Sequence, residues 1–438
     1  MKRGKQNKIT SLYIILYIGI LLIPFNLYAQ SGWDNSTIKE GDIKQHLPGI
    51  LSPKSWAKRD STFFITYHGI LDKGETTFNL VDGFTIWQSL TTRWNKQKSG
   101  FTELHGSIGY SLTTQDLLGR IHLAYTANER HYWFASIQNI SEDFKDDTYE
   151  ENMHLDLFAI LFAQRNYKKY YRSQRASVSW AYMPTDARLN TKYQISLEHT
   201  SPLENETSFT LFPRKDRSFD TNTPFNNELD KVQLEADSYL LQKWDICYYM
   251  GEQKQYNIAT SYTLGLKDRG KKHFHKLDLG MHGINGNHQH RIVWSLAGGT
   301  FFNSSPFHFS QYAHFKSTNS DVTTRNISEE MFVKNGYELS TMKPWTKIDL
   351  AFQSKKCLLS QWNWLRSNSA YEELYIKTMF PKDEPYRLHV GYSLHQLFES
   401  LSLGVEYQHT EPNINTWGVY VSLPFMEVIK TKRYFHKW

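Results

Sequence analysis

The chain has 438 residues, of which 40% are hydrophobic and 15% aromatic, a length that suits one large domain or two to three ordinary ones. Its formal net charge is +6, but Lys2, Arg3, Lys5 and Lys8 supply +4, the stretch from Met426 supplies +3, and the residues between sum to −1. Because the body of the chain has no basic excess, nucleic acid is not an expected partner.

The first 29 residues are predicted to be an export signal. Basic residues precede an apolar run from Leu12 to Ile23, and the triplet Leu27-Tyr28-Ala29 offers a cleavage site before Gln30. An uncleaved anchor is the alternative, although this apolar run is short for a spanning helix. No other stretch approaches about 18 continuous apolar residues, so further membrane helices are not expected.

Residues 30 to 73 are predicted to be a polar leader segment without its own core, because polar residues dominate and Pro48 and Pro53 interrupt the chain. From residue 74 to 425, apolar and polar residues alternate with a period of two, which predicts β-strands. The connections are too short for crossover helices, so an antiparallel meander is expected. The alternating segments lie at 84–94, 103–112, 120–126, 133–137, 176–182, 193–198, 276–282, 291–296, 347–353, 387–394, 401–408 and 417–423.

The last three segments show the pattern most clearly. In the first of them Leu388, Val390, Tyr392 and Leu394 alternate with small or polar residues, and the next two segments repeat this design. Each is about 8–10 residues long, the reach of a tilted membrane-spanning strand. A barrel hides such a signal from mean hydropathy, because only alternate residues meet lipid.

Three stretches interrupt the strands. Residues Glu150 to Arg172, with Leu157, Ile160 and Leu161 at helical spacing, are predicted to form one amphipathic helix of three to four turns. We expect it in a loop, at the barrel end or inside the lumen, and a role in occluding the lumen is the alternative to simple loop packing. Residues 213–227 and 304–335 are mostly polar and are predicted to be surface loops.

The predicted fold is therefore all-β: a membrane-spanning antiparallel β-barrel of about 16 strands, with a range of 14–18, and one amphipathic helix in a loop. The barrel occupies residues 74–425 and a basic tail follows at 426–438. No fixed-period repeat is visible, which argues against a propeller or solenoid.

Charged residues on the polar face are predicted to point into the lumen. Both signs are interspersed among them, which favours a salt-bridged, hydrated lumen over a strongly ion-selective pore. The set comprises Glu103, His105, Arg120, His122, Glu198, Lys276, Asp278, Arg291, Lys347, Asp349, Arg387, His389 and Glu406.

No metal, cofactor or catalytic residue is predicted. His273 and His275 share a strand face, as His288 and His290 do, but no third ligand follows at a telling spacing after His282, and turn histidines are the expectation. Cys247 and Cys357 are expected to be unpaired thiols, with a disulfide as the alternative.

The best candidate for a hydrolase is the hairpin from Glu103 to Thr126. If it closes near Thr114, His122 lies opposite Ser107 and diagonally to His105, while Glu103 lies about 13 Å further along. This arrangement does not supply a nucleophile, a base and an orienting group within hydrogen-bond reach, so no enzymatic activity is expected.

Four short motifs lie in order between about residues 150 and 425: NYKKYY at 166–171, SPLENET at 201–207, GGTFF at 298–302 and QYAHF at 311–315. Through them the chain resembles a family of Gram-negative outer-membrane proteins of unknown function, whose longer members carry a carboxypeptidase-regulatory-like domain ahead of a barrel. This chain is expected to be a short member without that domain. The family is similar in architecture to surface-antigen barrels that assemble or translocate outer-membrane proteins.

These observations predict a non-enzymatic protein of the Gram-negative outer membrane that serves envelope transport, export or assembly. Its expected partners are outer-membrane lipid and other envelope proteins. Two alternatives stay open: an outer-membrane hydrolase with a luminal or rim site, and a soluble secreted β-protein that binds glycans, which the high aromatic content also suits.

Overall fold

The computed structural model divides the chain into residues 1–47 and 48–438, and every residue that it describes belongs to the second unit. The predicted signal segment 1–29 and tail 426–438 lie outside the described residues, as do Cys357 and His288. The described residues are 54–58, 62–69, 78–96, 100–126, 128, 130–145, 153–184, 188–251, 255–287, 289–303, 307–318, 322–323, 330–333, 335–355, 359, 370–397, 401–410 and 414–422.

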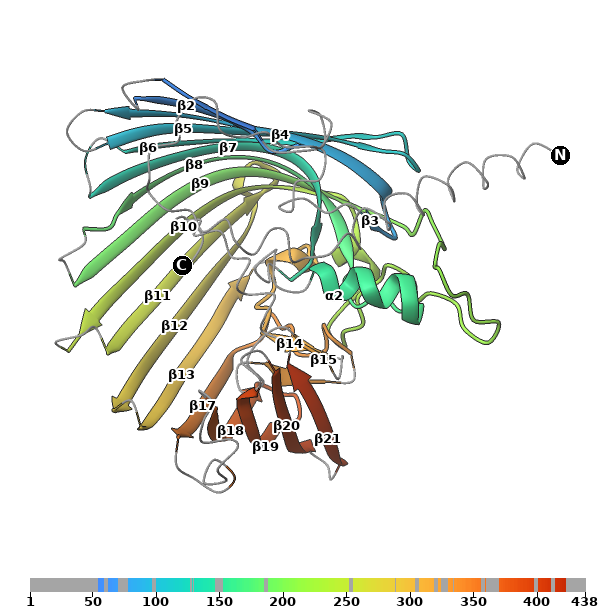
Figure 1. Ribbon diagram of the computed structural model, residues 1–438, viewed down its shortest axis with the longest axis vertical. Helices are drawn as coiled ribbons and strands as arrows, with labels where there is room; N and C mark the ends of the chain where they lie inside the picture. Colours follow the sequence, from blue (N-terminus) through green and yellow to red (C-terminus); the bar gives the residue numbers. More distant parts are fainter. Residues whose placement is uncertain are drawn as a thin grey trace. The chain divides into compact units, whose positions relative to one another are not determined.

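One large antiparallel sheet dominates the second unit (Figure 1). Seventeen of its strands pair in chain order, each with the next, so the predicted all-β meander is confirmed and its count lies within the predicted range. They are β1 (Lys54–Ala57), β2 (Phe63–Tyr67), β4 (Gly83–Lys96), β5 (Gly100–Ser111), β6 (Leu117–Thr126), β7 (His131–Asp143), β8 (Tyr170–Tyr182), β9 (Leu189–Pro202), β10 (Asp237–Met250), β11 (Tyr256–Lys267), β12 (Lys272–Gly286), β13 (His290–Asn303), β17 (Trp345–Ser354), β18 (Tyr371–Pro381), β19 (Arg387–Leu397), β20 (Leu401–Thr410) and β21 (Ile414–Ser422).

Short elements fill the connections. They are β3 (Phe78–Asn79), β14 (Ser317–Thr318), β15 (Val322–Thr323), β16 (Met331–Phe332), the α-helix α2 (Met153–Phe158), the π-helix η2 (Ala159–Ala163), and the 3-10 helices η3 (Lys231–Leu234), η4 (Asp268–Gly270) and η5 (Phe309–Gln311). β14 pairs with β16, and β15 extends the edge of β21, both in parallel. In the described part of the chain no pairing joins β1 to β21. Among the same residues, no helix is both long and apolar enough to cross a membrane.

Side chains alternate between the two faces as predicted. Along β9, Ile195 and Leu197 are 41% and 62% exposed, whereas their neighbours Ser196 and Glu198 are each 4% exposed. Strands elsewhere repeat this inversion of the usual soluble pattern, in which apolar residues are buried. Exposed apolar side chains on the same face include Ile86, Leu104, Ile121, Ile137, Val178, Leu279, Ile292, Leu350, Ile376, Val390, Leu403 and Val419. The sheet thus has an apolar outer face and a polar inner face.

An aromatic row crosses the outer face along one line of the strand register. Its members lie directly opposite one another on six consecutive strands, β6 to β11, at register positions Tyr125, Trp133, Trp180, Tyr193, Trp244 and Tyr262. Trp133 and Trp244 are 48% and 51% exposed. Rows of Trp and Tyr mark the level of lipid headgroups in membrane barrels, because their rings have an apolar body and a polar tip.

The predicted helix is shorter than residues 150–172. It covers α2 and η2, and it ends at Gln164, which adopts a left-handed conformation with φ 53°. Asp156 then accepts hydrogen bonds from the backbone N–H groups of Tyr167 and Lys168, which turns the chain into β8. The predicted apolar stripe is confirmed where it is described, since Ile160 and Leu161 are buried against Leu80.

The sheet also begins earlier than the predicted boundary at residue 74, because β1 and β2 come from the stretch assigned to the polar leader. β2 pairs with the end of β4, with Phe63 opposite Trp94. The two strands are only four and five residues long, and Lys54–Ala57 is exposed throughout, so their pattern is weak in the sequence.

Candidate functional site: the occupied lumen

The inner face carries the charged residues that the sequence placed there, and many form ion pairs. Lys347 Nζ lies 2.6 Å from Asp349 Oδ2, and Lys276 Nζ lies 3.6 Å from Asp278 Oδ2. Arg175 bridges Glu142 at 2.6 Å and Glu198 at 3.3 Å. Mixed signs therefore neutralise one another along the wall, as a salt-bridged lumen requires.

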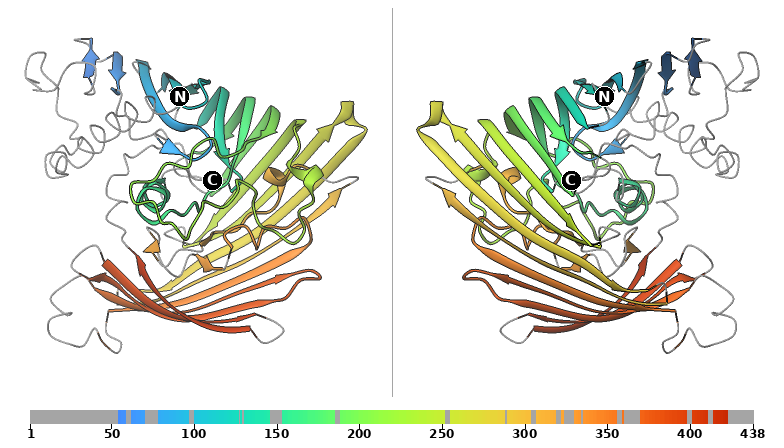
Figure 2. Two further views of the ribbon diagram at one scale, coloured as in Figure 1. Left: turned by 90° about the vertical axis from the view of Figure 1, so that its right-hand side faces the viewer. Right: turned by 90° about the vertical axis from the view of Figure 1, so that its left-hand side faces the viewer.

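The segment between β13 and β17 is not the predicted surface loop. Of its described residues, those at 307–318, 330–333 and 335–342, called here the inner segment, are largely buried, and Phe307, Phe309 and Met331 are at most 1% exposed. Figure 2 shows the corresponding chain running within the curve of the sheet. The prediction was wrong because polar residues between these aromatic ones masked an apolar pattern that has neither a helical nor a strand period.

Two apolar clusters seat the inner segment on the wall. In the first, Phe307, Phe315, Met331 and Leu339 pack with wall residues of β10, β12, β13 and β18; the wall residues are Tyr239, Phe274, Phe301 and Met379. In the second, Phe309, Tyr312 and Tyr337 pack against Phe144 and Tyr171. The wall residues face inward but are apolar or aromatic, so the inner face is adapted to hold this segment.

Glycine permits one of these contacts. A Cβ atom on Gly265 of β11 would lie 2.0 Å from the ring of Phe274 on the neighbouring strand. The ring therefore lies over the backbone of β11, and from there its edge meets Phe307 with a centroid distance of 4.5 Å. Any larger residue at position 265 would push Phe274 away from the inner segment.

Residues in or next to β7, β8 and β10 hold one side of the inner segment by hydrogen bonds. Lys145, just beyond β7, donates to the carbonyl and hydroxyl oxygens of Ser317, both at 2.9 Å. The Tyr337 hydroxyl donates to Asp143 Oδ1 at 2.5 Å and accepts the Lys169 N–H at 2.6 Å. The backbone N–H of His308 donates to the Tyr239 hydroxyl at 2.8 Å.

The opposite end of the sheet order supplies a second set of anchors. Lys377 Nζ of β18 donates to the carbonyl oxygen of Glu330 at 2.5 Å. Phe332 stacks on Tyr420 of β21 with centroids 3.4 Å apart. Arg387 of β19 forms an ion pair with Glu338. The inner segment is thus tied to strands from β7 to β21 and braces them from within.

A buried ionic cluster lies beneath the second set. Lys377 Nζ is 2.7 Å from Glu406 Oε2, and His389 Nδ1 is 2.7 Å from Glu406 Oε1. All three side chains are at most 1% exposed. His389 and Glu406 were predicted to face inward, whereas Lys377 was missed, because apolar residues occupy both faces of β18.

Burial sets the protonation of groups in the inner segment. It lowers the pKa of His308 to about 4 and that of His314 to about 3, because a charged imidazole would lose its hydration there. Burial also raises the pKa of Tyr337 well above its usual value. At neutral pH both imidazoles and the phenol are uncharged, which suits a packed interior.

The hairpin proposed as the best hydrolase candidate has a different register. His122 lies opposite His105, and Arg120 rather than His122 lies opposite Ser107. The turn closes earlier than assumed because Ser111 fixes it: its Oγ accepts the Thr114 N–H at 3.0 Å, and its carbonyl accepts the Gln115 N–H at 3.0 Å. The two imidazole centroids are 6.4 Å apart.

A serine, histidine and glutamate constellation does occur elsewhere, on β18 to β20. His395 Nε2 lies 2.9 Å from Glu373 Oε2, and His395 Nδ1 lies 3.2 Å from Ser402 Oγ. The ring joins an acid and a hydroxyl through opposite nitrogens, as a nucleophilic triad requires. Yet Ser402 is 2% exposed and His395 1%, so the hydroxyl faces no space for a substrate. Sequence reasoning missed the set because its members lie on three strands.

Among the described residues, no group of three or more His, Cys, Asp or Glu side chains is arranged to hold a metal ion. His273 and His275 do share a strand face, with ring centroids 5.4 Å apart. His275 bonds the Tyr262 hydroxyl at 2.6 Å. Cys247 is a buried free thiol.

A family profile described as the family of unknown function (DUF5686), C-terminal domain, matches residues 48–394. The comparison with curated proteins found no match.

Among solved structures, the chain is similar to CdiB from Acinetobacter baumannii at 9% identity and a TM-score of 0.39, covering 78% of this chain and 57% of that one. It is similar to BamA from Haemophilus ducreyi lacking POTRA domains 1–3, at 9% identity and a TM-score of 0.41, covering 84% and 70%. A bacterial polysaccharide outer membrane secretin gives 8% identity and a TM-score of 0.32, covering 85% and 96%. The chain spans little more than half of the first of these, and such distant similarities say nothing about activity.

Proposed function

The chain belongs to the family of unknown function (DUF5686), whose C-terminal domain it matches over residues 48–394. Because the family has no known function, we propose a role for the chain from its own geometry. It is a non-enzymatic β-barrel of the Gram-negative outer membrane, and it serves envelope transport, export or assembly. The inner segment acts as a gate that fills the lumen in the resting state. The association with a carboxypeptidase-regulatory-like domain stays a prediction.

The inverted sheet carries this proposal. Exposed Leu, Ile and Val side chains cover the outer face while ion pairs line the inner one, and an aromatic row crosses β6 to β11. A soluble protein would lose free energy by leaving so many apolar side chains in water, at roughly 25 cal/mol per Å². A bilayer removes that cost, and the aromatic row supplies the headgroup contact.

The lengths of the connections support an orientation. The segments 144–169, 203–236 and 304–344 all leave the sheet at the end where β7, β9 and β13 finish, whereas most turns at the other end are short. Outer-membrane barrels have short periplasmic turns and longer extracellular loops. The end with α2 and the entrance of the inner segment therefore faces the cell exterior in this proposal.

Fractionation tests the membrane assignment. The mature protein is expected in outer membranes, resistant to a high-salt or carbonate wash and released by detergent. Recovery in the wash would favour the soluble glycan-binding alternative and would overturn the proposal.

Conductance in planar bilayers tests the gate. The intact protein is expected to conduct little, and Arg387→Gln combined with Lys145→Gln, which removes anchors on both sides of the inner segment, is expected to raise conductance. A matched variant, Lys382→Gln, alters an exposed turn lysine outside the lumen and is expected to leave conductance unchanged. Equal conductance in all three proteins would rule out the gate.

The hydrolase alternative has one observation in its favour, the Ser402–His395–Glu373 constellation. Its burial argues for a structural role. Hydrolysis of a small ester such as 4-nitrophenyl acetate should therefore be the same in the intact protein and in Ser402→Ala. An activity that Ser402→Ala abolishes while the variant still inserts in membranes would make the protein an enzyme.

A further inference from the structure

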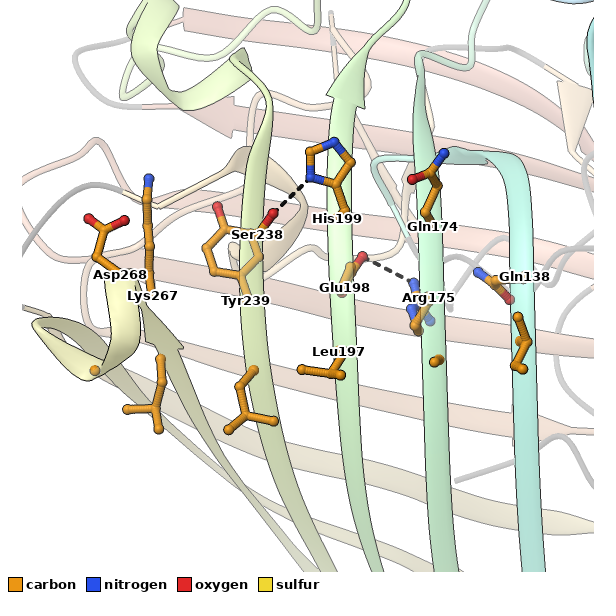
Figure 3. Close-up of a pocket in the computed structure, with 15 residues that line it drawn as sticks. Gln138, Gln174, Arg175, Leu197, Glu198, His199, Ser238, Tyr239, Lys267 and Asp268 are labelled. Carbon is orange, nitrogen blue, oxygen red and sulfur yellow. Dashed lines mark hydrogen bonds and ion pairs between the residues drawn. The ribbon is translucent and has the colours of Figure 1, made fainter.

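A groove of about 800 Å³ crosses the sheet at the end where β7, β9 and β11 finish and β8 and β10 begin (Figure 3). Its lining includes alternate residues of the apolar outer face: Ile137, Ala176, Leu197, Leu240 and Leu266. Ile137 and Leu197 are 65% and 62% exposed, among the most exposed apolar side chains of the sheet. The floor of the groove is therefore suited to a hydrocarbon chain.

Polar side chains stand at the head of this floor. Gln174 lies opposite His199, and His199 opposite Ser238, so the three form one register row on the outer face. His199 Nδ1 and Ser238 Oγ share a hydrogen bond of 2.8 Å, which Figure 3 shows above Leu197. These three side chains lie on the mainly apolar outer face and point away from the lumen, so they do not take part in its ion pairs.

The polar row is well separated from the aromatic row along the strands. On β8, six residues separate Trp180 in the aromatic row from Gln174 in the polar row, or about 20 Å at roughly 3.3 Å per residue. The apolar band of an outer-membrane barrel is about 25 Å tall and is bounded by polar or aromatic residues on both sides. A strand tilted by about 40° turns the length along β8 into roughly 15 Å of height, so the polar row lies well above the aromatic row, toward the end of the sheet where the groove opens.

A basic hairpin borders the groove. Lys267, Asp268 and Gly270 line it, and the exposed residues Lys271 and Lys272 follow in the same turn. Lys272 forms an exposed ion pair with Asp268 at 3.3 Å, and Lys267 pairs with Asp237 at 2.6 Å. Lys271 is a further, exposed cation of this turn, and among the side chains that the structure describes no anion pairs with it. A positive charge beside hydrogen-bonding groups at the head of an apolar floor is complementary to an anionic lipid.

We propose that this groove binds a phosphate-bearing anionic lipid of the membrane that the sheet spans. The acyl chain lies on Leu197, Leu240 and Leu266, and the headgroup meets His199, Ser238 and Lys271. This inference rests on the proposed membrane location. It adds a specific lipid site to one side of the barrel wall.

Native mass spectrometry of the full-length protein in nanodiscs tests it. The discs contain equal amounts of phosphatidylglycerol and phosphatidylcholine, and the readout is the number of each lipid that stays bound on release. The intact protein is expected to retain phosphatidylglycerol preferentially, and Lys271→Gln to reduce that retention about fivefold. His199→Leu with Ser238→Ala is expected to reduce the retention of both lipids.

The matched control is Lys382→Gln, which removes an exposed lysine from the β18–β19 turn at the same end of the sheet, away from the groove. It is expected to retain phosphatidylglycerol as the intact protein does. Equal retention of the two lipids by the intact protein, or equal losses in the groove and control variants, would overturn the lipid site alone. Failure of the intact protein to enter the discs would instead overturn the proposed membrane location.

Discussion

Lys377 places a primary ammonium group inside the wall with 1% side-chain exposure, and Glu406 beside it has none. Neither charge would be tolerated alone, because burying an unpaired ion costs several kcal/mol. His389 contacts the same carboxylate, and the Glu330 carbonyl takes another of the lysine's hydrogen bonds. One lysine therefore links the wall cluster to the inner segment.

Lys377→Met is expected to lower the free energy of unfolding by about 3 kcal/mol, since it leaves Glu406 without its main counter-charge. Urea titration of the vesicle-folded protein, followed by tryptophan fluorescence, measures the change. Adding Glu406→Gln should restore part of the loss, because the orphaned charge is then removed. A single variant as stable as the intact protein would refute the account of this cluster.

The two imidazoles of the inner segment predict a pH dependence. Their pKa values of about 4 and about 3 in the folded chain lie below the usual 6.5. Between these lowered pKa values and pH 6.5, the unfolded inner segment therefore binds more protons than the folded one. The stability of the folded inner segment falls as the pH falls through this window. The contribution of His308 is complete above pH 6.5 and is lost as the pH drops to about 4.

Hydrogen exchange measures this effect at the right place. Amides of residues 307–318, corrected for the intrinsic rate, should be less protected at pH 4.5 than at pH 7, while amides of β9 should change less. His308→Gln combined with His314→Gln should weaken the pH dependence. Equal protection of the inner segment at both pH values would contradict the predicted burial of neutral imidazoles.

At the scale of elements, the inner segment depends on aromatic packing. Phe307→Ala removes a side chain that is 1% exposed and meets both Phe274 and Tyr239, a change that typically costs 3–5 kcal/mol. We expect it to loosen the inner segment and raise single-channel conductance. Phe302→Ala is the control, because Phe302 is 63% exposed on the outer face. Similar conductance in the two variants would show that the segment does not close the lumen.

The same packing explains which strands could be predicted. β9, β19 and β20 alternate cleanly in the sequence because their inner residues are polar. β10 and β18 were not singled out, since Leu240 and Leu241, or Tyr375 and Ile376, place large side chains on both faces. Inward Tyr239, Tyr375 and Met379 pack on the inner segment. A strand that packs against an internal segment has apolar residues on its inner face as well. Its sequence therefore does not alternate between apolar and polar residues, as a strand facing a water-filled lumen does.

The candidate site was predictable only in part for a related reason. Ion pairs between residues two apart on one strand, such as Lys347 with Asp349, could be predicted, because such residues point to the same face. The anchors Lys145 to Ser317 and Arg387 to Glu338 join residues far apart in the chain. Their positions depend on a path through the lumen that local periodicity does not encode.

At the scale of the whole sheet, lipid contact predicts an asymmetric response to charge. Leu279, at the middle of β12, is 53% exposed on the outer face. Leu279→Arg is expected to lower the free energy of unfolding in vesicles by about 2–4 kcal/mol. Gln194→Arg, which adds the same charge to the inner face of β9, should have a smaller effect. Urea titration of both variants in vesicles provides the comparison. A larger loss of unfolding free energy for Gln194→Arg would mean that the face assigned here to the lumen is the one that meets lipid.

The sheet's two faces can be distinguished most directly by spin labels on β9 in reconstituted vesicles. Single cysteines at Ile195, Ser196 and Leu197, in a chain with Cys247→Ser and Cys357→Ser, are labelled and their relaxation by oxygen and by a water-soluble nickel complex is compared. We predict that oxygen relaxes the labels at 195 and 197 more strongly than the label at 196. Strong relaxation by the nickel complex at 195 and 197 would place these side chains in water and contradict a membrane-spanning barrel.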